Sequence, residues 1–327
     1  SDVCSSDLSP SPERIRKARL TQFQEWLEAE RGLTFTDYEA LWRWSTTDLD
    51  GFWQACWDFF GIEASKPASA VLGKRTMPGA EWFPGAELNY ARHMLRNEKP
   101  GQTALLHLNE RQALEAITWD DLGNRVRVVA TQLRRLGVKK GDRVCAYIVN
   151  IPEALVAMLA TTAIGAIWSS CGPDFGTPGV LDRFSQLDPT VFIHVDGYQY
   201  GGKPFDRREE VEKILARLTS VKTVIQVPYL DPANPRRLTP DTVLWSELLD
   251  HPPVAREDFR YEEVPFMHPL WILFSSGTTG LPKPIMHSHG GIVLEQLKHY
   301  AFNFDMHAGD RLFFFTTTGW KIGRAHV

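Results

Sequence analysis

The feature that most constrains the fold is a regular alternation of short apolar runs and amphipathic helical patterns from about residue 103 onward. Strands are predicted at 103–108, 143–149, 166–170, 191–195, 221–227, 270–274 and 312–315. Helices are predicted between them at 122–136, 153–163 and 208–217, with a further one from 290. A strand, a crossover helix and a second strand form a parallel unit, so the pattern predicts an α/β fold with a parallel sheet. The runs are continuously apolar, which is typical of strands buried on both faces.

The predicted helix at 122–136 shows the amphipathic pattern most clearly. Its apolar residues recur at spacings of three and four, and they are Leu122, Val126, Val129, Leu133 and Leu136. The arginines off that stripe are expected to form a solvated face rather than a binding patch, and they are Arg125, Arg127, Arg134 and Arg135. Gly137 suits the C-terminal cap of this helix.

Residues 10–65 are rich in aromatic side chains at helical spacings, namely Trp42, Trp44, Phe52, Trp53, Trp57, Phe59 and Phe60. This predicts a helical layer whose aromatic residues pack in a core rather than line a ligand site. In contrast, the proline-rich segment 228–253 is expected to be an excursion without a core of its own.

Composition narrows the class of protein. With 36 Lys and Arg against 40 Asp and Glu in 327 residues, the net charge of −4 offers no electrostatic reason for a nucleic-acid or acidic-membrane partner. No apolar run approaches the roughly 20 residues that span a bilayer, and no signal sequence is evident at the N-terminus, so a cytoplasmic protein is expected. The widely spaced Cys4, Cys56, Cys145 and Cys171 are expected to be buried thiols in a reducing compartment rather than zinc ligands or disulfides.

The two ends of the chain are related through the genetic code. One permitted coding of KIGRAHV (321–327) has a reverse complement that encodes DVCSSDL (2–8). This resembles read-through of a sequencing adapter, whereas a genuine inverted terminal repeat is the alternative. We therefore expect residues 1–8 and 321–327 to be foreign, residues 9–100 to form an N-terminal helical cap, and residues 101–320 to form an incomplete large domain.

The stretch that carries chemistry is SSGTTGLPK (275–283), which directly follows the apolar run 270–274. Its glycines allow close backbone approach, its hydroxyl and amide groups can converge on one anion, and Lys283 adds positive charge. This predicts a polyphosphate cradle rather than a plain polar turn. It is not a Walker A loop, because two residues rather than four separate Gly277 from Gly280, and Pro284 follows the lysine.

His287 and His289 lie close to this loop and could be mistaken for a metal pair. They are separated by a single residue, and neither a carboxylate nor a cysteine is nearby in the sequence. A structural role is therefore expected for both histidines.

SSGTTGLPK resembles the phosphate loop of the acyl-adenylate-forming superfamily, also called the AMP-dependent synthetases and ligases. Flanking blocks extend the resemblance over most of 40–320: RWSTTDLDGFWQACWDFFGI (43–62), WFPGAELNYA (82–91), IGAIWSSCGPDFG (164–176), LDRFSQLDP (181–189) and FFFTTTGW (313–320). Within the superfamily, these blocks look most like the acetoacetate–CoA ligase branch. The resemblance implies a truncated adenylate-forming large domain preceded by the helical layer.

The resemblance also implies roles for particular residues. The β- and γ-phosphates of ATP would be held by the loop, namely Ser275, Ser276, Gly277, Thr278, Thr279, Gly280 and Lys283. A segment similar to the CoA-contacting basic Gly-Gly of related enzymes is formed by Gly201, Gly202 and Lys203, although Tyr200 stands where those enzymes have Arg. Trp320 is expected either to line the acyl pocket or to belong to the core.

The reaction so implied converts acetoacetate, ATP and CoA into acetoacetyl-CoA, AMP and diphosphate, with Mg²⁺ as a further cofactor. The alternatives are an acetyl- or propionyl-CoA synthetase and, from a different class, a non-catalytic nucleotide-binding module. The adenine, ribose and magnesium motifs and the C-terminal domain of the family would follow residue 320. The chain as given is therefore expected to be inactive and poorly soluble.

Overall fold

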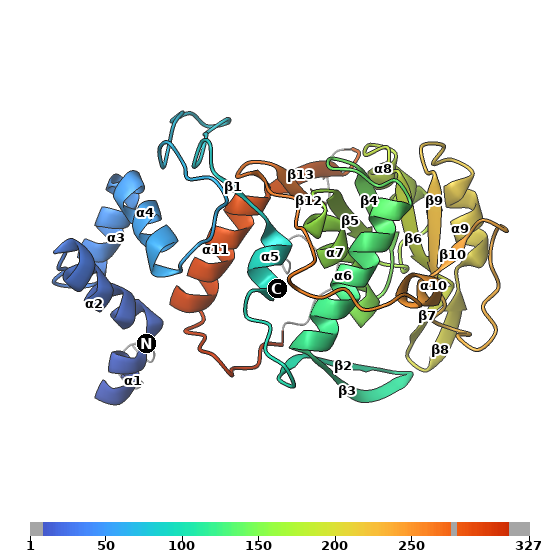
Figure 1. Cartoon of the computed structure of the whole chain (residues 1–327), viewed down its shortest axis with the longest axis horizontal. Helices are drawn as coiled ribbons and strands as arrows, with labels where there is room; N and C mark the ends of the chain where they lie inside the picture. Colours follow the sequence, from blue (N-terminus) through green and yellow to red (C-terminus); the bar gives the residue numbers. More distant parts are fainter. Residues whose placement is uncertain (1–8, 276–279, 314–327) are drawn as a thin grey trace, which may run out of the picture.

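A computed structural model describes residues 9–275 and 280–313 of the chain. Figure 1 shows an N-terminal group of helices at one end of the molecule and a twisted sheet with helices on both faces at the other. The N-terminal group consists of α1 (Pro12–Lys17), α2 (Arg19–Arg31), α3 (Tyr38–Thr47) and α4 (Leu49–Phe59). The later helices are α5 (Tyr90–Leu95), α6 (Trp119–Arg135), α7 (Pro152–Ala163), α8 (Thr177–Phe184), α9 (Arg208–Leu215), α10 (Trp245–Leu249) and α11 (His289–Phe302).

The N-terminal helices form the packing layer that the aromatic pattern predicts. The Asp37 side chain accepts the Ala40 N–H and starts α3, and Gly32 ends α2 with φ +65°. The Phe23 ring lies 5.1 Å from that of Phe59 and 4.8 Å from that of Phe302, which ties this layer to α11. Every aromatic side chain of the predicted stripe packs against the core except Trp42, which is 52% exposed.

The central sheet, as far as the structure describes it, has seven strands in the order β10-β9-β6-β4-β5-β12-β13. These strands are β4 (Arg143–Tyr147), β5 (Ile167–Cys171), β6 (Val191–Val195), β9 (Thr223–Val227), β10 (Val243–Leu244), β12 (Pro269–Ser275) and β13 (Lys283–Ser288). All neighbouring pairs are parallel except β12 and β13, which are antiparallel. The predicted parallel α/β architecture is confirmed.

Helices cover both faces of the sheet because the chain reverses its direction of travel across it. From β4 the chain moves to β5 on one side, and from β5 it returns to β6 on the other side of β4. Crossovers of one handedness then place α7 and α8 on opposite faces. Side chains alternate accordingly: Val144 and Ala146 belong to the larger core, whereas Cys145 and Tyr147 belong to the smaller one. Buried Cys56, Cys145 and Cys171 are free thiols, as predicted for them.

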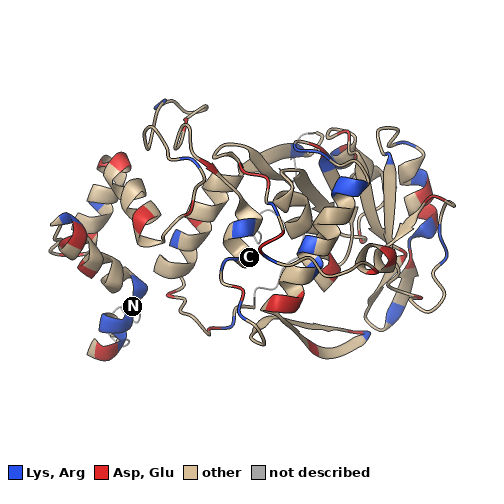
Figure 2. Ribbon diagram, in the orientation of Figure 1, with Lys and Arg blue, Asp and Glu red and all other residues tan. Residues whose placement is uncertain are grey.

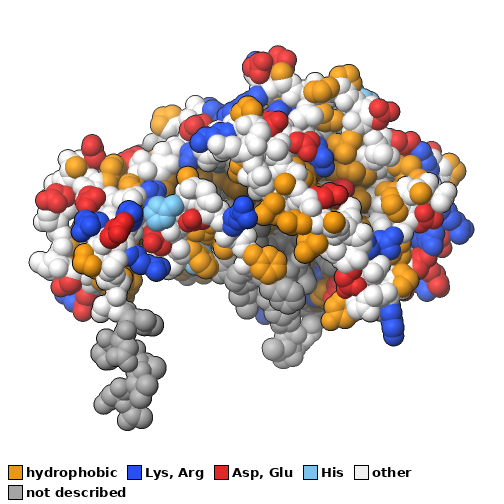
Figure 3. Space-filling view, turned by 90° about the horizontal axis from the view of Figure 1, so that it is seen from below, with side chains coloured by type: hydrophobic (Ala, Val, Ile, Leu, Met, Phe, Trp, Pro, Cys, Tyr) orange, Lys and Arg blue, Asp and Glu red, His pale blue; other side chains and the backbone are white. Residues whose placement is uncertain are grey.

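The strand predicted at 103–108 exists but lies outside the parallel sheet. It is β2 (Thr103–Asn109), and it forms an antiparallel hairpin with β3 (Gln112–Thr118). Placing it with the parallel strands was wrong, because the turn after Asn109 is too short for a crossover helix. The outer face of this hairpin is apolar and exposed, as at Leu108 and Leu114, and Figure 3 shows hydrophobic side chains at the surface on this side of the molecule.

The solvated face predicted for the arginines of α6 is wrong for Arg127. Its guanidinium is buried and donates to both carboxylate oxygens of Glu98, at 2.8 and 3.2 Å, and to the Val254 carbonyl at 2.7 Å. Arg127 lies beside the apolar stripe, where segments from elsewhere in the chain cover it. Elsewhere Lys and Arg alternate with Asp and Glu over the ribbon, as Figure 2 shows.

The segment 228–253 has no core of its own, as expected: β10 extends the sheet beyond β9, and Trp245 and Leu248 of α10 are buried in the larger core of the sheet. The strand expected at 312–315 is wrong for Leu312 and Phe313, which are exposed and lie in no strand because no described strand pairs with them; residues 314 and 315 lie outside the described residues. No helix within 9–275 or 280–313 is long and apolar enough to cross a bilayer.

Candidate functional site

The predicted phosphate loop leaves the sheet at the carboxyl end of β12. Ser275 is the last residue of β12 and pairs in register with Lys283, the first residue of β13. The structure therefore brings the two ends of the loop together, with Lys283 exposed beside them. Residues 276–279 lie outside the described residues, and Gly280 has φ +145°, a backbone conformation that L side chains rarely adopt.

This position is the usual place for a ligand in an open α/β sheet. β12 is parallel to β5 and adjacent to it, so the loop leaves the sheet at the edge where the parallel strands have their carboxyl ends, and ligands of open α/β sheets bind outside this edge. The crossovers after β4 and β6 run in opposite directions, so the switch point of the sheet lies between these two strands, and β4 and β5 separate it from β12. The architecture thus places the glycine- and hydroxyl-rich segment where a nucleotide is commonly bound.

The turn that follows β5 is held rigidly by side chains that sequence reasoning missed. The Tyr147 hydroxyl lies 2.8 Å from the Pro173 carbonyl and 2.7 Å from that of Phe175, and burial raises the pKa of this phenol. Arg207 donates to the Pro173 carbonyl at 2.8 Å, and the Arg183 guanidinium lies 4.5 Å from the centre of the Phe175 ring. The only indication in the sequence was that Tyr147 places a hydroxyl group at the end of a mostly apolar strand.

A hydrogen bond joins the segment that follows α8 to the exit of the phosphate loop. The side-chain amide of Gln186, two residues beyond α8, donates to the Pro282 carbonyl at 2.9 Å and to the Asp182 carbonyl at 2.6 Å. Pro282 immediately precedes Lys283, so this contact fixes the backbone from which the lysine extends. Gln186 lies within the block LDRFSQLDP, but no local pattern indicated its partner.

The candidate CoA segment forms the turn of a separate hairpin. Gly201 and Gly202 join β7 (Gly197–Tyr200) to β8 (Lys203–Asp206). Their backbone N–H groups both donate to the carboxylate of Glu110. Lys203 and Tyr200 are exposed on either side of the turn.

His289 has the structural role that was expected. It is fully buried, its Nδ1 accepts the Tyr90 N–H at 3.2 Å, and burial lowers the pKa of the imidazole to about 3. Within the described ranges, no group of three or more His, Cys, Asp or Glu residues is arranged to hold a metal ion. Trp320 lies outside the described residues.

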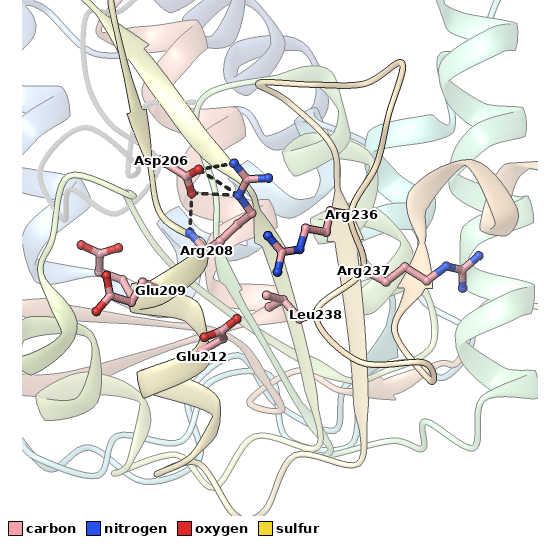
Figure 4. Close-up of a pocket in the computed structure, with 8 residues that line it drawn as sticks. Asp206, Arg208, Glu209, Glu212, Arg236, Arg237 and Leu238 are labelled. Carbon is pink, nitrogen blue, oxygen red and sulfur yellow. Dashed lines mark hydrogen bonds and ion pairs between the residues drawn. The ribbon is translucent and has the colours of Figure 1, made fainter.

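Two surface cavities are lined by described residues that lie outside the loop. One of about 430 Å³ lies between α9 and the segment 236–238, where Figure 4 shows Glu209 and Glu212 on one side and Arg236 and Arg237 on the other, with Asp206 paired to Arg208. Another of about 530 Å³ is lined by alternating arginines and glutamates around Arg92. Neither cavity contains a predicted site residue.

Comparison with known proteins gives matches along the chain. Residues 94–327 match the family model described as AMP-binding enzyme, and residues 38–94 match that of the acetyl-coenzyme A synthetase N-terminus. An acetoacetyl-coenzyme A synthetase of Rhizobium meliloti (strain 1021) is 40% identical over 96% of this chain and 48% of its own length. A malonamoyl-CoA synthetase of Penicillium aethiopicum is 32% identical over 94% of this chain and 44% of its own.

A solved structure supports the fold assignment. The acetoacetyl-CoA synthetase from Streptomyces lividans superposes with a TM-score of 0.91 at 46% identity, covering 97% of this chain and 48% of that one. The chain spans about half the length of the relatives it matches.

Proposed function

Because this chain belongs to the AMP-binding enzyme family, we propose that the protein is an ATP-dependent acid–thiol ligase that converts acetoacetate to acetoacetyl-CoA. The observation that carries this proposal is the sequence SSGTTGLPK at the carboxyl end of β12, with Lys283 in register with Ser275. Acetoacetate is favoured as the acid because the relatives from Rhizobium meliloti and Streptomyces lividans, 40% and 46% identical, are named acetoacetyl-CoA synthetases.

In the first half-reaction, a carboxylate oxygen of the acid attacks the α-phosphorus of ATP, and the bond to the bridging oxygen of diphosphate breaks. We assign the task of holding the β- and γ-phosphates to Ser275, Ser276, Gly277, Thr278, Thr279, Gly280 and Lys283. Amide and hydroxyl donors together with one ammonium group stabilise the charge that builds on the departing diphosphate. In the second half-reaction, the CoA thiol attacks the acyl carbonyl carbon, loses its proton, and AMP leaves.

The remaining assignments follow from the family. We propose that Gly201, Gly202 and Lys203 contact CoA, that Trp320 lines the acyl pocket, and that residues 9–100 cap a large domain at 101–320. The two family models meet at residue 94, which supports a division near this point. The described residues offer no ligand cluster for Mg²⁺, so we assign no residue to it and derive no step through it.

A panel of short acids tests the substrate. The product of the complete reading frame is incubated with ATP, CoA and acetoacetate, acetate, propionate or malonamate, and AMP release is measured. We expect the highest kcat/KM with acetoacetate. A preference for another acid contradicts the substrate assignment but leaves the ligase class intact, whereas ATP binding without any ATP–diphosphate exchange indicates a non-catalytic nucleotide-binding module.

A second candidate is an acetyl- or propionyl-CoA synthetase. The match of residues 38–94 to the acetyl-coenzyme A synthetase N-terminus favours it. It ranks second because the relatives that cover nearly the whole chain, at 36–40% identity, carry the acetoacetyl name.

A further inference from the structure

Two hairpin turns that lie far apart in the sequence meet through a single carboxylate. The turn of β2–β3 contains Glu110, and Figure 1 shows it beside hairpin β7–β8. One carboxylate oxygen accepts the Gly201 N–H at 2.9 Å, and the other accepts the Gly202 N–H at 2.7 Å. Both amides of the glycine turn therefore bind an anion that the chain itself supplies.

The shape of the glycine turn explains why it binds an anion. Gly201 and Gly202 have φ of +58° and +74°, and in such turns successive N–H groups point to one side and form an anion-binding concavity. A Cβ at either position would meet no atom within 4 Å, so the space around the turn is open. Lys203 follows directly and is exposed, which places an ammonium group next to the amides.

Glu110 can leave these amides without separating the hairpins, because a neighbouring residue holds the two turns together. Arg111 donates to the Gln199 side chain at 3.1 Å and to the Leu230 carbonyl at 2.7 Å, and its guanidinium lies 5.8 Å from the centre of the Tyr229 ring. The hydrogen bonds from Gly202 and Gly201 lower the pKa of Glu110, so its carboxylate is ionised at neutral pH. Glu110 itself is exposed, which leaves it free to rotate into solvent.

We propose that Glu110 sets the affinity of the enzyme for CoA by occupying the Gly201 and Gly202 amides until a phosphate group of CoA replaces it. This inference rests on the proposed function and extends it to a residue that does not itself bind the thiol substrate. A phosphate carries more charge than a carboxylate and gains Lys203 as an additional partner, so it can displace Glu110. While Glu110 is in place, the amides are available only in the fraction of molecules in which it has rotated away, and the apparent affinity falls by that fraction.

The steady-state test replaces Glu110 in the product of the complete reading frame. We expect Glu110→Ala and Glu110→Gln to lower the KM for CoA by about threefold to tenfold, which corresponds to a free-amide fraction of about a third to a tenth in the parent. ATP–diphosphate exchange, which needs no CoA, should not change. Glu115→Gln, which removes a carboxylate of the same hairpin away from the turn, should leave the KM for CoA unaltered.

Amide hydrogen exchange of the segment 199–204 separates displacement from a merely structural contact. In the parent protein, Glu110 protects the two glycine amides. In Glu110→Ala this protection should be lost and then restored by saturating CoA. Comparing CoA with dephospho-CoA identifies the group: restoration by CoA alone assigns the 3′-phosphate, and restoration by both assigns the diphosphate.

The outcomes are decisive for Glu110. An unchanged or raised KM for CoA in both variants, or amides that CoA leaves unprotected in Glu110→Ala, overturns the inference. If the parent shows ATP–diphosphate exchange while either of these results is obtained, only the role of Glu110 fails. If the parent shows no ATP–diphosphate exchange, the proposed function fails. Amide hydrogen exchange of Gly201 and Gly202 with and without CoA then still decides whether an anion displaces Glu110.

Discussion

The side-chain amide of Gln186 lies 2.9 Å from the backbone carbonyl of Pro282, and through it the end of α8 is tied to the exit of the phosphate loop. This hydrogen bond is exposed, so its contribution to global stability is small. Its position one residue before Lys283 gives it a larger role in orienting the loop.

We expect Gln186→Ala to raise the KM for ATP by about threefold to tenfold while changing kcat and the melting temperature little, on the scale of one lost neutral hydrogen bond. The matched control is Gln54→Ala, which removes a similar side-chain hydrogen bond from α4. Steady-state kinetics at varied ATP provide the measurement. Equal effects of the two substitutions would mean that Gln186 does not orient the loop.

Replacing Lys283 by Ala, or Thr278 by Val, should slow acyl-adenylate formation in the product of the complete reading frame. The expected loss is about tenfold to a thousandfold, or about 1.4 to 4 kcal/mol, because a donor to the departing diphosphate is removed. ATP–diphosphate exchange measures the adenylation step, and Lys298→Ala on α11 serves as a control for loss of a lysine. Unchanged exchange in both loop variants would remove the loop from the mechanism.

The buried pair of Arg127 and Glu98 should be costly to break. Their side chains are only 6% and 9% exposed, so Arg127→Ala leaves a buried carboxylate unpaired and should lower the free energy of unfolding by about 3 to 5 kcal/mol. Chemical denaturation measures the change. The double variant Arg127→Met with Glu98→Leu removes both charges and should recover most of the lost free energy of unfolding. If the double variant is destabilised as much as Arg127→Ala, the charges themselves are required for stability.

The free energy of unfolding should decrease as the pH is lowered below 6.5, because His289 is buried. Burial, with a smaller contribution from His268, lowers its pKa from 6.5 to about 3 in the folded chain. Between these values the unfolded chain binds a proton that the folded chain does not, so the stabilisation is fully present above pH 6.5 and is lost as the pH falls toward 3. This residue contributes a slope of up to about 1.4 kcal/mol per pH unit to the free energy of unfolding.

Urea unfolding at pH 7.5, 6.5 and 5.5 measures the slope. His289→Gln keeps an acceptor for the Tyr90 N–H but does not titrate, so its stability should decline less steeply below pH 6.5. His251→Gln, at an exposed position, should follow the parent. Parallel curves for the parent and His289→Gln would contradict the assignment of the slope to this histidine.

Local patterns were sufficient for much of the fold. The apolar runs at 191–195 and 270–274 became β6 and the greater part of β12, and the stripe from Leu122 to Leu133 became the buried face of α6. The loop at 275–283 could be proposed as a phosphate site because its glycines, hydroxyl residues and lysine lie close together in the chain. The side-chain period of a helix or strand and the chemistry of a short loop depend on neighbouring residues, so the sequence alone determined them.

Tertiary structure decided the features that join distant segments. Whether β2 entered the parallel sheet or formed a hairpin depended on which backbone groups were available to pair with it. Likewise, whether Arg127 faced water or Glu98 depended on a segment almost thirty residues away, and Glu110 reaches the Gly201 amide across 91 positions of the chain. No periodicity encodes such contacts, because burial and hydrogen bonding depend on the full set of neighbours that the folded chain brings to each side chain.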